Sequence, residues 1–282
     1  MVDTEKWKNI LADTARAFLY DKKLTFPDNL AEDGIFLRKL LYDNDINEIF
    51  YDRIVASGYE SRIDADTLDF LKKNIRQTAA RNTILYFQLG IILKAFTGKG
   101  IKTTVIKGVD IIDSLYENPA LRHCHDIDIL IDAKDLPAAE TLLQTMDYTP
   151  SSDNPLHRKM QKHIVYYNKK TGPPVEIHYI PGDNYIREIR EFAYICNRGR
   201  MKNLGGQKTI VASPEDNLLY LCNHLIKHQL GKNVFKSLID ISLLITKYRK
   251  EIVWDYIVDK SMQWGISSRI FITLYLLKNQ LD

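Results

Sequence analysis

The amino-acid sequence predicts an α+β protein in which a small mixed β-sheet is flanked by an N-terminal and a C-terminal helical region. Apolar residues recur at helical spacing through residues 1–97. Short β-rich runs bounded by glycine and proline fill residues 98–182, and helical spacing returns in residues 183–282. We therefore expect two helical regions on either side of one α/β core.

The N-terminal region is predicted to contain short helices followed by a long one. Within residues 4–60, apolar residues three and four positions apart indicate short helices. Ser61 or Asp64 can cap the next helix, because both side chains accept hydrogen bonds from the first backbone N–H groups. The apolar spacing continues to about Thr97, where glycine residues end it.

Strands and helices alternate in the central region. Residues 101–108 form a β-rich run that stops at a glycine, and Val109 to Tyr116 follows as a short helix. Residues 126–132 alternate apolar and polar side chains and predict a second strand, with an amphipathic helix from Leu136 to Met146 after it. Residues 163–168 and 175–180 are two more strands, which we expect to pair as an antiparallel hairpin across a short, turn-rich segment.

One irregular basic stretch, from Asn197 to Lys208, interrupts the helical pattern of the C-terminal region. Ser213-Pro-Glu-Asp216 then marks a helix start, since serine caps, proline fits the first turn and acids suit the positive end of the helix dipole. We expect this helix to run from about Pro214 to Gln229. Two further helices are predicted over residues 235–250 and 254–263, before a last apolar helical segment.

Composition limits the classes of function. The chain has 282 residues, 45% hydrophobic and 27% charged, a mixture typical of soluble globular proteins. It has no apolar run near the ~20 residues of a membrane span and no secretory pattern at its start, so we expect a cytoplasmic protein. Its three cysteines are widely spaced and indicate neither a disulfide framework nor a Cys-x-x-Cys metal site.

Charge is distributed unevenly along the chain. Residues 157–250 carry 17 lysines and arginines against 7 acidic residues, whereas residues 1–156 carry 19 against 25. The basic part favours an anionic partner: a nucleoside triphosphate, a polynucleotide or an acidic protein. A solvated basic surface is the alternative. Since no familiar nucleic-acid motif occurs, nucleic acid ranks last.

Asp126 and Asp128 are the leading candidates for chemistry. Alternate residues of a strand share a face, so both carboxylates point one way while Ile127, Ile129 and Ile131 point toward the core. Two carboxylates about 6.5 Å apart along a strand repel each other unless water or a cation lies between them. Hard cations such as Mg²⁺ bind carboxylate and phosphate oxygens together. A solvated Asp-x-Asp on an exposed strand is the alternative.

Glu176 is the third candidate carboxylate, and it shares a strand face with His178. If its strand lies beside the Asp126 strand, Glu176 completes a three-carboxylate site. Such a site can hold metal ions that activate an attacking oxygen and neutralise a triphosphate. A cross-strand partner for a lysine is the alternative interpretation of Glu176.

Four motifs together make the sequence resemble the nucleotidyltransferase (polymerase β-like) superfold, in particular a poorly characterised bacterial family. They are Val105-Ile-Lys-Gly108 before a helix ending in Leu115-Tyr116, Arg122 before Asp126-Ile-Asp-Ile-Leu130, Val175-Glu-Ile-His178, and Ser213-Pro-Glu-Asp216 leading to His224, His228 and Asp240. The resemblance covers about residues 102–254. It implies that Gly108 approaches the phosphates, that Asp126 and Asp128 bind metal, and that Glu176 supplies the third acid.

The glycine turn departs from the family pattern. Most active members place Gly-Ser or Gly-Gly there, and the serine contacts phosphate, whereas Val109 follows Gly108 in this chain. The interval to Asp126 is also long. Phosphate contacts then fall to Lys107 and Arg122, which flank the site and can form charge-assisted hydrogen bonds. Each is otherwise a surface cation.

The histidines are weaker candidates. His224 and His228 lie one helical turn apart, but Leu225 follows the first where a metalloprotease has glutamate, which excludes that class. With His178, they are candidates for contacts to acceptor or phosphate, or for proton removal. A buried structural role is the alternative. His123 and His125, on either side of Cys124, are assigned no function.

The sequence thus predicts a metal-dependent nucleotidyltransferase that moves a nucleoside monophosphate, such as AMP, from a nucleoside triphosphate to a small-molecule or protein acceptor and releases pyrophosphate. Mg²⁺ or Mn²⁺ is the expected cofactor. The metal ligands and catalytic residues are then Asp126, Asp128 and Glu176, and the nucleotide contacts are Lys107, Gly108 and Arg122. A catalytically degenerate nucleotide-binding or partner protein on the same fold is the alternative, which the missing serine favours.

Overall fold

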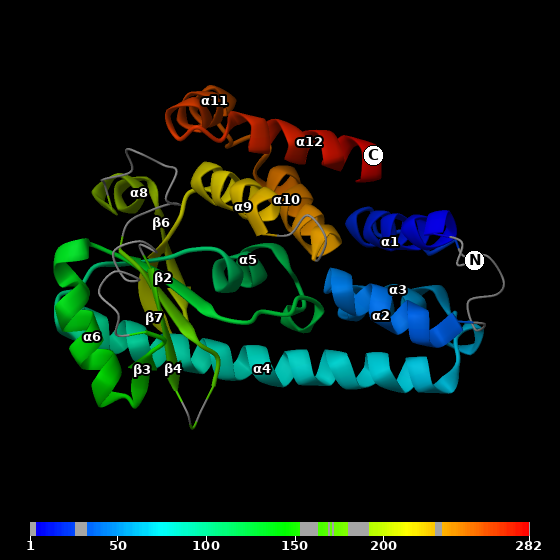
Figure 1. Cartoon of the computed structure of the whole chain (residues 1–282), viewed down its shortest axis with the longest axis horizontal. Coiled ribbons are helices and arrows are strands. Elements are labelled where there is room, and N and C mark those ends of the chain that lie inside the picture. The colour runs from blue at the N-terminus through cyan, green and yellow to red at the C-terminus, as the bar shows by residue number, and fades with distance from the viewer. Residues whose placement is uncertain are drawn as a thin grey trace.

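The computed structural model describes residues 4–25, 33–152, 163–168, 170, 172–179, 192–228 and 233–281. The described residues form an α+β fold in which helices surround one mixed sheet (Figure 1). Long helix α4 runs along one side of the molecule, with α2 and α3 beside its N-terminal end, α1 on the far side of these two, and the sheet at its C-terminal end (Figure 1). The predicted fold class is confirmed.

The N-terminal helices follow the sequence prediction closely. They are α1 (Thr4–Leu19), α2 (Gly34–Asn44), α3 (Asn47–Ser57) and α4 (Ala65–Gly98). Asp64 is the N-cap of α4, and its carboxylate accepts a 2.9 Å hydrogen bond from the backbone N–H of Thr67. This bond satisfies one of the otherwise unpaired N–H groups of the first turn.

Seven strands of the described residues form the sheet, in the order β3-β4-β5-β2-β1-β7-β6. Their bounds are β1 Thr103–Val105, β2 Ile127–Ile131, β3 Tyr148–Pro150, β4 His163–Asn168, β5 Val175–His178, β6 Arg200–Leu204 and β7 Gln207–Val211. Strands β4 and β5 pair antiparallel, as predicted, although Ile180 of the predicted strand lies outside the described residues. Strand β2 pairs in parallel with β5 and antiparallel with β1.

The β6–β7 hairpin corrects the sequence prediction, which treated the stretch from Asn197 to Lys208 as irregular. The two strands pair antiparallel, and β7 extends the sheet by pairing in parallel with β1. Gly205 and Gly206, both at positive φ, form the turn. The alternation is weak in the sequence because the inward face of β6 carries Arg200 and Lys202, whose ammonium pairs with buried Asp110, and because exposed Met201 is apolar, so the stretch resembles a basic loop.

An apolar core on one face of the sheet confirms the predicted direction of the β2 isoleucines. Ile127, Ile129 and Ile131 are fully buried in a cluster with residues of α4 and of α6 (Leu136–Thr145), such as Leu89 and Leu143. Burial of these side chains stabilises the sheet against both helices. The alternate residues of β2 and β5 therefore face the opposite side of the sheet.

The C-terminal helices lie on that opposite side (Figure 1). They are α8 (Phe192–Arg198), α9 (Pro214–His228), α10 (Val234–Tyr248), α11 (Trp254–Gln263) and α12 (Ser267–Leu281). Ser213 caps α9 as predicted, since its Oγ accepts a 3.1 Å hydrogen bond from the N–H of Asp216. Helices α9, α10 and α12 share an apolar core with α1. No helix of the described residues is long and apolar enough to cross a membrane.

Candidate active site

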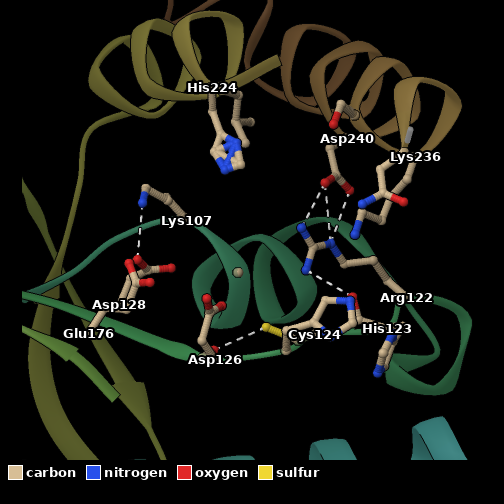
Figure 2. Close-up of a pocket in the computed structure, with 15 residues that line it drawn as sticks. Lys107, Arg122, His123, Cys124, Asp126, Asp128, Glu176, His224, Lys236 and Asp240 are labelled. Carbon is tan, nitrogen blue, oxygen red and sulfur yellow. Dashed lines mark hydrogen bonds and ion pairs between the residues drawn. The ribbon is translucent and has the colours of Figure 1, made fainter. Parts of the chain in front are cut away.

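Strands β2 and β5, which carry the candidate acids, are paired neighbours in the sheet, as a shared three-carboxylate site requires. In the parallel register of β2 and β5, Asp128 is opposite Glu176, and Leu130 is opposite His178. Asp128 and Glu176 therefore project from the face of the sheet opposite to that of the buried β2 isoleucines. Asp126, which precedes β2 by one residue, lines the same pocket as Asp128 and Glu176 (Figure 2).

Asp128 is the centre of a compact polar cluster. It is only 3% exposed, and its Oδ1 accepts hydrogen bonds from Lys107 Nζ at 3.0 Å and from His178 Nε2 at 2.8 Å. His178 Nε2 also lies 3.3 Å from Glu176 Oε2. One possible ligand atom from each of Asp128, Glu176 and His178 falls within 4.8 Å of the others, which is a spacing compatible with a shared metal ion.

The environment separates the pKa values of the two aspartates. Burial, followed by the charges of Asp128 and Glu176, raises the pKa of Asp126 to about 7. Burial alone would also raise the pKa of Asp128, but the Lys107 ammonium and the His178 hydrogen bond outweigh it and hold that pKa well below its usual range. Asp128 is therefore ionised at neutral pH, while Asp126 holds a proton to a much higher pH than a free carboxyl does.

The turn between β1 and α5 (Gly108–Leu115) places Lys107 over the acids. Lys107 has a φ of 53° and a ψ of −130°, a backbone conformation that a residue with a Cβ rarely adopts. Such strain persists where surrounding contacts hold it, and it occurs often at functional sites. Here the turn directs the ammonium at Asp128, as Figure 2 shows.

Gly108 is required at this turn by close packing. A Cβ on Gly108 would lie 2.5 Å from Cys124 Sγ, well inside van der Waals contact. We expect Gly108→Ala to lower the free energy of unfolding by about 1–3 kcal/mol, the range for overpacking a well-packed site. Urea denaturation measures this change. Gly98→Ala is the matched control, because nothing lies within 4 Å of a Cβ there. Equal stability of the two variants would contradict the packing argument.

Arg122 is a buried cation, in contrast to the alternative of a surface residue. Its Nη2 donates to Asp240 Oδ2 at 2.8 Å, and its Nε lies 3.2 Å from both carboxylate oxygens. The hydroxyl of Tyr116 donates to Asp240 Oδ1 at 2.8 Å. Arg122 Nη1 would lie 3.8 Å from a Cβ on Gly108, so the guanidinium adjoins the glycine turn. The Arg122–Asp240 ion pair therefore connects α10 to the pocket.

Helices α9 and α10 provide the wall opposite the carboxylates. His224 projects from α9 into the pocket, on the side of Lys107 (Figure 2). Lys236 and Ser237 of α10 line the pocket as well. The side chain of His228 lies outside the described residues. Sequence reasoning did not single out Lys236, although Lys236 and Asp240 are four residues apart in a helix rich in apolar residues, which is a signal for buried charge.

His123 and His125 also line the pocket, at its rim, and both lie near Asp45. Asp45 follows α2 and is bonded to the Lys236 ammonium. The sequence assigned these histidines no function, and Asp45 was not a candidate. Asp45 and His123 are 78 residues apart in the chain, so spacing within the sequence does not reveal that they lie close together.

Residues 36–282 match the model of a protein family described as uncharacterised nucleotidyltransferase. The chain belongs to this nucleotidyltransferase family. In this family member, the glycine turn, the paired aspartates and Glu176 lie together in one pocket. A comparison with curated proteins gave no match.

Solved structures similar to this nucleotidyltransferase family member include an antigenic nucleotidyltransferase-like protein from Paracoccidioides brasiliensis. It is 17% identical, with a TM-score of 0.42, and the match covers 66% of this chain and 91% of that one. The antibiotic-resistance factor ANT(2'')-Ia is 11% identical, with a TM-score of 0.44 and coverage of 70% and 97%. The lincosamide antibiotic adenylyltransferase LnuA is 20% identical, with a TM-score of 0.37 and coverage of 58% and 96%.

Proposed function

We propose that this protein is a metal-dependent nucleotidyltransferase, which transfers a nucleoside monophosphate from a nucleoside triphosphate to an acceptor and releases pyrophosphate. AMP transfer from ATP is the first case to test. The observation that carries the proposal is the convergence of Asp126, Asp128 and Glu176 on one pocket. Family membership supports the same reaction. The acceptor is a small molecule or a protein side chain.

The donor set fits a hard divalent cation. Asp126, Asp128 and Glu176 offer carboxylate oxygens, the ligands that Mg²⁺ and Mn²⁺ prefer. Burial, followed by the negative charges of Asp128 and Glu176, raises the pKa of Asp126, and a divalent cation between the acids would offset that repulsion. When bound, such a metal neutralises the triphosphate and stabilises the attacking and leaving oxygens.

The chain's own residues account for the rest of the reaction. The acceptor oxygen attacks the α-phosphorus, and the bond from that phosphorus to the β-phosphate bridging oxygen breaks, so pyrophosphate leaves with the bond electrons. Glu176 accepts the proton of the acceptor, because its side chain, 22% exposed, is the more accessible acid of the β2–β5 pair. Lys107 and Arg122 supply positive charge beside the departing pyrophosphate.

Mg²⁺ affinity should depend on pH through Asp126. A proton on Asp126 competes with the metal, so we expect affinity to fall about tenfold per pH unit below 7 and to level off above it.

Without metal, the raised pKa of Asp126 has the opposite effect on folding stability. The folded state keeps a proton that the unfolded chain releases near about pH 4, so stability falls as pH rises toward 7.

Isothermal titration calorimetry with Mg²⁺ and a non-hydrolysable ATP analogue from pH 5.5 to 8.5 measures this dependence. The Asp126→Asn variant is the control, because it carries no titrating carboxylate at that position; its Mg²⁺ binding should be weaker at every pH and should show no step near pH 7. An affinity that stays constant between pH 5.5 and 8.5 in the unmodified protein would contradict the role of Asp126.

Label transfer tests the function itself. The protein is incubated with Mg²⁺ or Mn²⁺, a cell extract, and ATP labelled at either the α- or the γ-phosphate. Nucleotidyl transfer predicts a labelled acceptor from α-labelled ATP only, with labelled pyrophosphate from the γ-labelled form. Transfer of the γ-label would identify a kinase instead. Tight ATP binding without transfer would identify a degenerate nucleotide-binding protein, which the valine at position 109 would then explain.

A further inference from the structure

We propose that Asp45, His123 and His125 form a second metal site, at the rim of the pocket, for a transition-metal ion of the zinc class. The site is separate in chemistry from the three carboxylates, because it offers two imidazole nitrogens and one carboxylate. Imidazole favours Zn²⁺, Co²⁺ and Ni²⁺, whereas Mg²⁺ favours oxygen ligands alone.

The three possible ligands already converge. One donor atom from each of Asp45, His123 and His125 lies within 4.8 Å of the others. His123 Nδ1 is 3.4 Å from Asp45 Oδ1, and His125 Nε2 is 3.8 Å from Asp45 Oδ2. The two imidazole rings meet edge to face, with centroids 4.1 Å apart. Small side-chain rotations bring such nitrogens to the roughly 2.0–2.1 Å of a zinc bond.

The backbone on both sides of the site is held in place. Arg81 of α4 donates from Nε to the carbonyl of Cys124 at 2.9 Å and from Nη2 to the carbonyl of His125 at 3.0 Å. Asp45 has a left-handed backbone at the end of α2, and its N–H bonds the carbonyls of Leu41 and Tyr42. The site is therefore largely preorganised, which reduces the entropy lost on binding.

Three protein ligands leave a coordination position open. Zinc is four-coordinate in most sites, and sites with three protein ligands hold water or a substrate in the fourth position. His123 and His125 line the same pocket as the three carboxylates, so an ion bound by them lies at its rim. An oxygen of a bound molecule is the expected fourth ligand.

Replacement of Lys236 tests the proposed site, because the direction in which metal affinity changes can be predicted. Its ammonium bonds Asp45, so a metal ion must share that carboxylate with an existing cation. Lys236→Met removes the competing charge and should raise metal affinity by about tenfold or more, since it removes the repulsion between two cations held close together. If the cluster served only as an ion-pair network, neither form of the protein would bind the metal.

Titration with Zn²⁺, and with Co²⁺ followed by visible absorption, tests the proposal. The full chain carries Asp126→Asn and Glu176→Gln, so that the carboxylate site does not contribute. We expect one ion per chain, and His125→Ala and Asp45→Asn should each lower the affinity at least about tenfold, because even outer-sphere partners of a metal ligand are worth that much. Asp43→Asn, an aspartate two residues away that pairs with Lys39, should leave it unchanged.

His125→Ala is the decisive variant if Asp45→Asn unfolds, because the His125 side chain is 58% exposed and its removal leaves the fold intact. The absence of a bound ion in the doubly substituted protein overturns the proposal. So does binding that His125→Ala leaves unchanged, which places the ion elsewhere. Because both results are obtained without the carboxylate site, they do not depend on the proposed nucleotidyl transfer.

Discussion

Asp128→Asn should abolish Mg²⁺-dependent binding of ATP and lower the rate of nucleotidyl transfer by roughly 10²- to 10³-fold, the scale on which loss of one preorganised electrostatic group acts. Asp128 is buried and ionised, and it bonds both Lys107 and His178. An amide cannot supply the missing negative charge to a cation. The amide oxygen can still accept hydrogen bonds from Lys107 and His178, but without the negative charge that strengthens them. Turnover of labelled ATP and calorimetry with Mg²⁺ measure the two effects.

Asp132→Asn is the matched control for this prediction. It makes the same chemical change one residue beyond the end of β2, where the side chain is 38% exposed and caps the N–H of Lys134. Asparagine caps as well as aspartate, so activity and stability should remain. Far-ultraviolet circular dichroism confirms that both variants fold. Unchanged metal-dependent ATP binding in Asp128→Asn would remove the basis of the proposed function.

Asp240→Ala should lower the free energy of unfolding by about 3–5 kcal/mol, the range for breaking one side of a buried ion pair. Arg122 is 8% exposed and Asp240 is 1% exposed, so the guanidinium would be left buried without its counter-charge. The Tyr116 hydroxyl would lose its acceptor as well. Urea denaturation followed by tryptophan fluorescence measures the loss. Asp43→Ala is the exposed counterpart and should change stability by less than about 1 kcal/mol.

The double variant Arg122→Met/Asp240→Leu separates folding from function. Replacing a buried pair by apolar side chains of similar size is often neutral or stabilising, so this protein should recover most of the lost stability. It should still transfer nucleotide poorly, because it lacks the cation beside the glycine turn. Full activity in the double variant would mean that Arg122 serves the fold alone.

Local patterns in the sequence were enough to predict most elements and the acidic site. Side-chain alternation places Ile127 toward the core and Asp128 on the other face, and the structure has this arrangement. The caps Asp64 and Ser213 depend only on residues within the first helical turn. These features were predictable because their physical causes act between residues close together in the chain.

The β6–β7 hairpin and the charge pairs were not predictable in this way. Strand β7 is recognisable as part of the sheet only through its pairing with β1, about 100 residues earlier in the chain. Arg122 meets Asp240 across 118 residues, and Lys236 meets Asp45 across 191. Periodicity shows which face of an element is apolar, but it does not show which other element covers that face.

Residue types, strand periodicity and turn chemistry were therefore sufficient to place Asp126, Asp128 and Glu176 as candidate metal ligands, since each of these constraints is local. The folded arrangement alone established that Lys107 bonds Asp128, that Asp240 holds Arg122, and that the pKa of Asp126 rises to about 7. Burial and pairing set these properties, and both depend on how distant segments pack around the pocket.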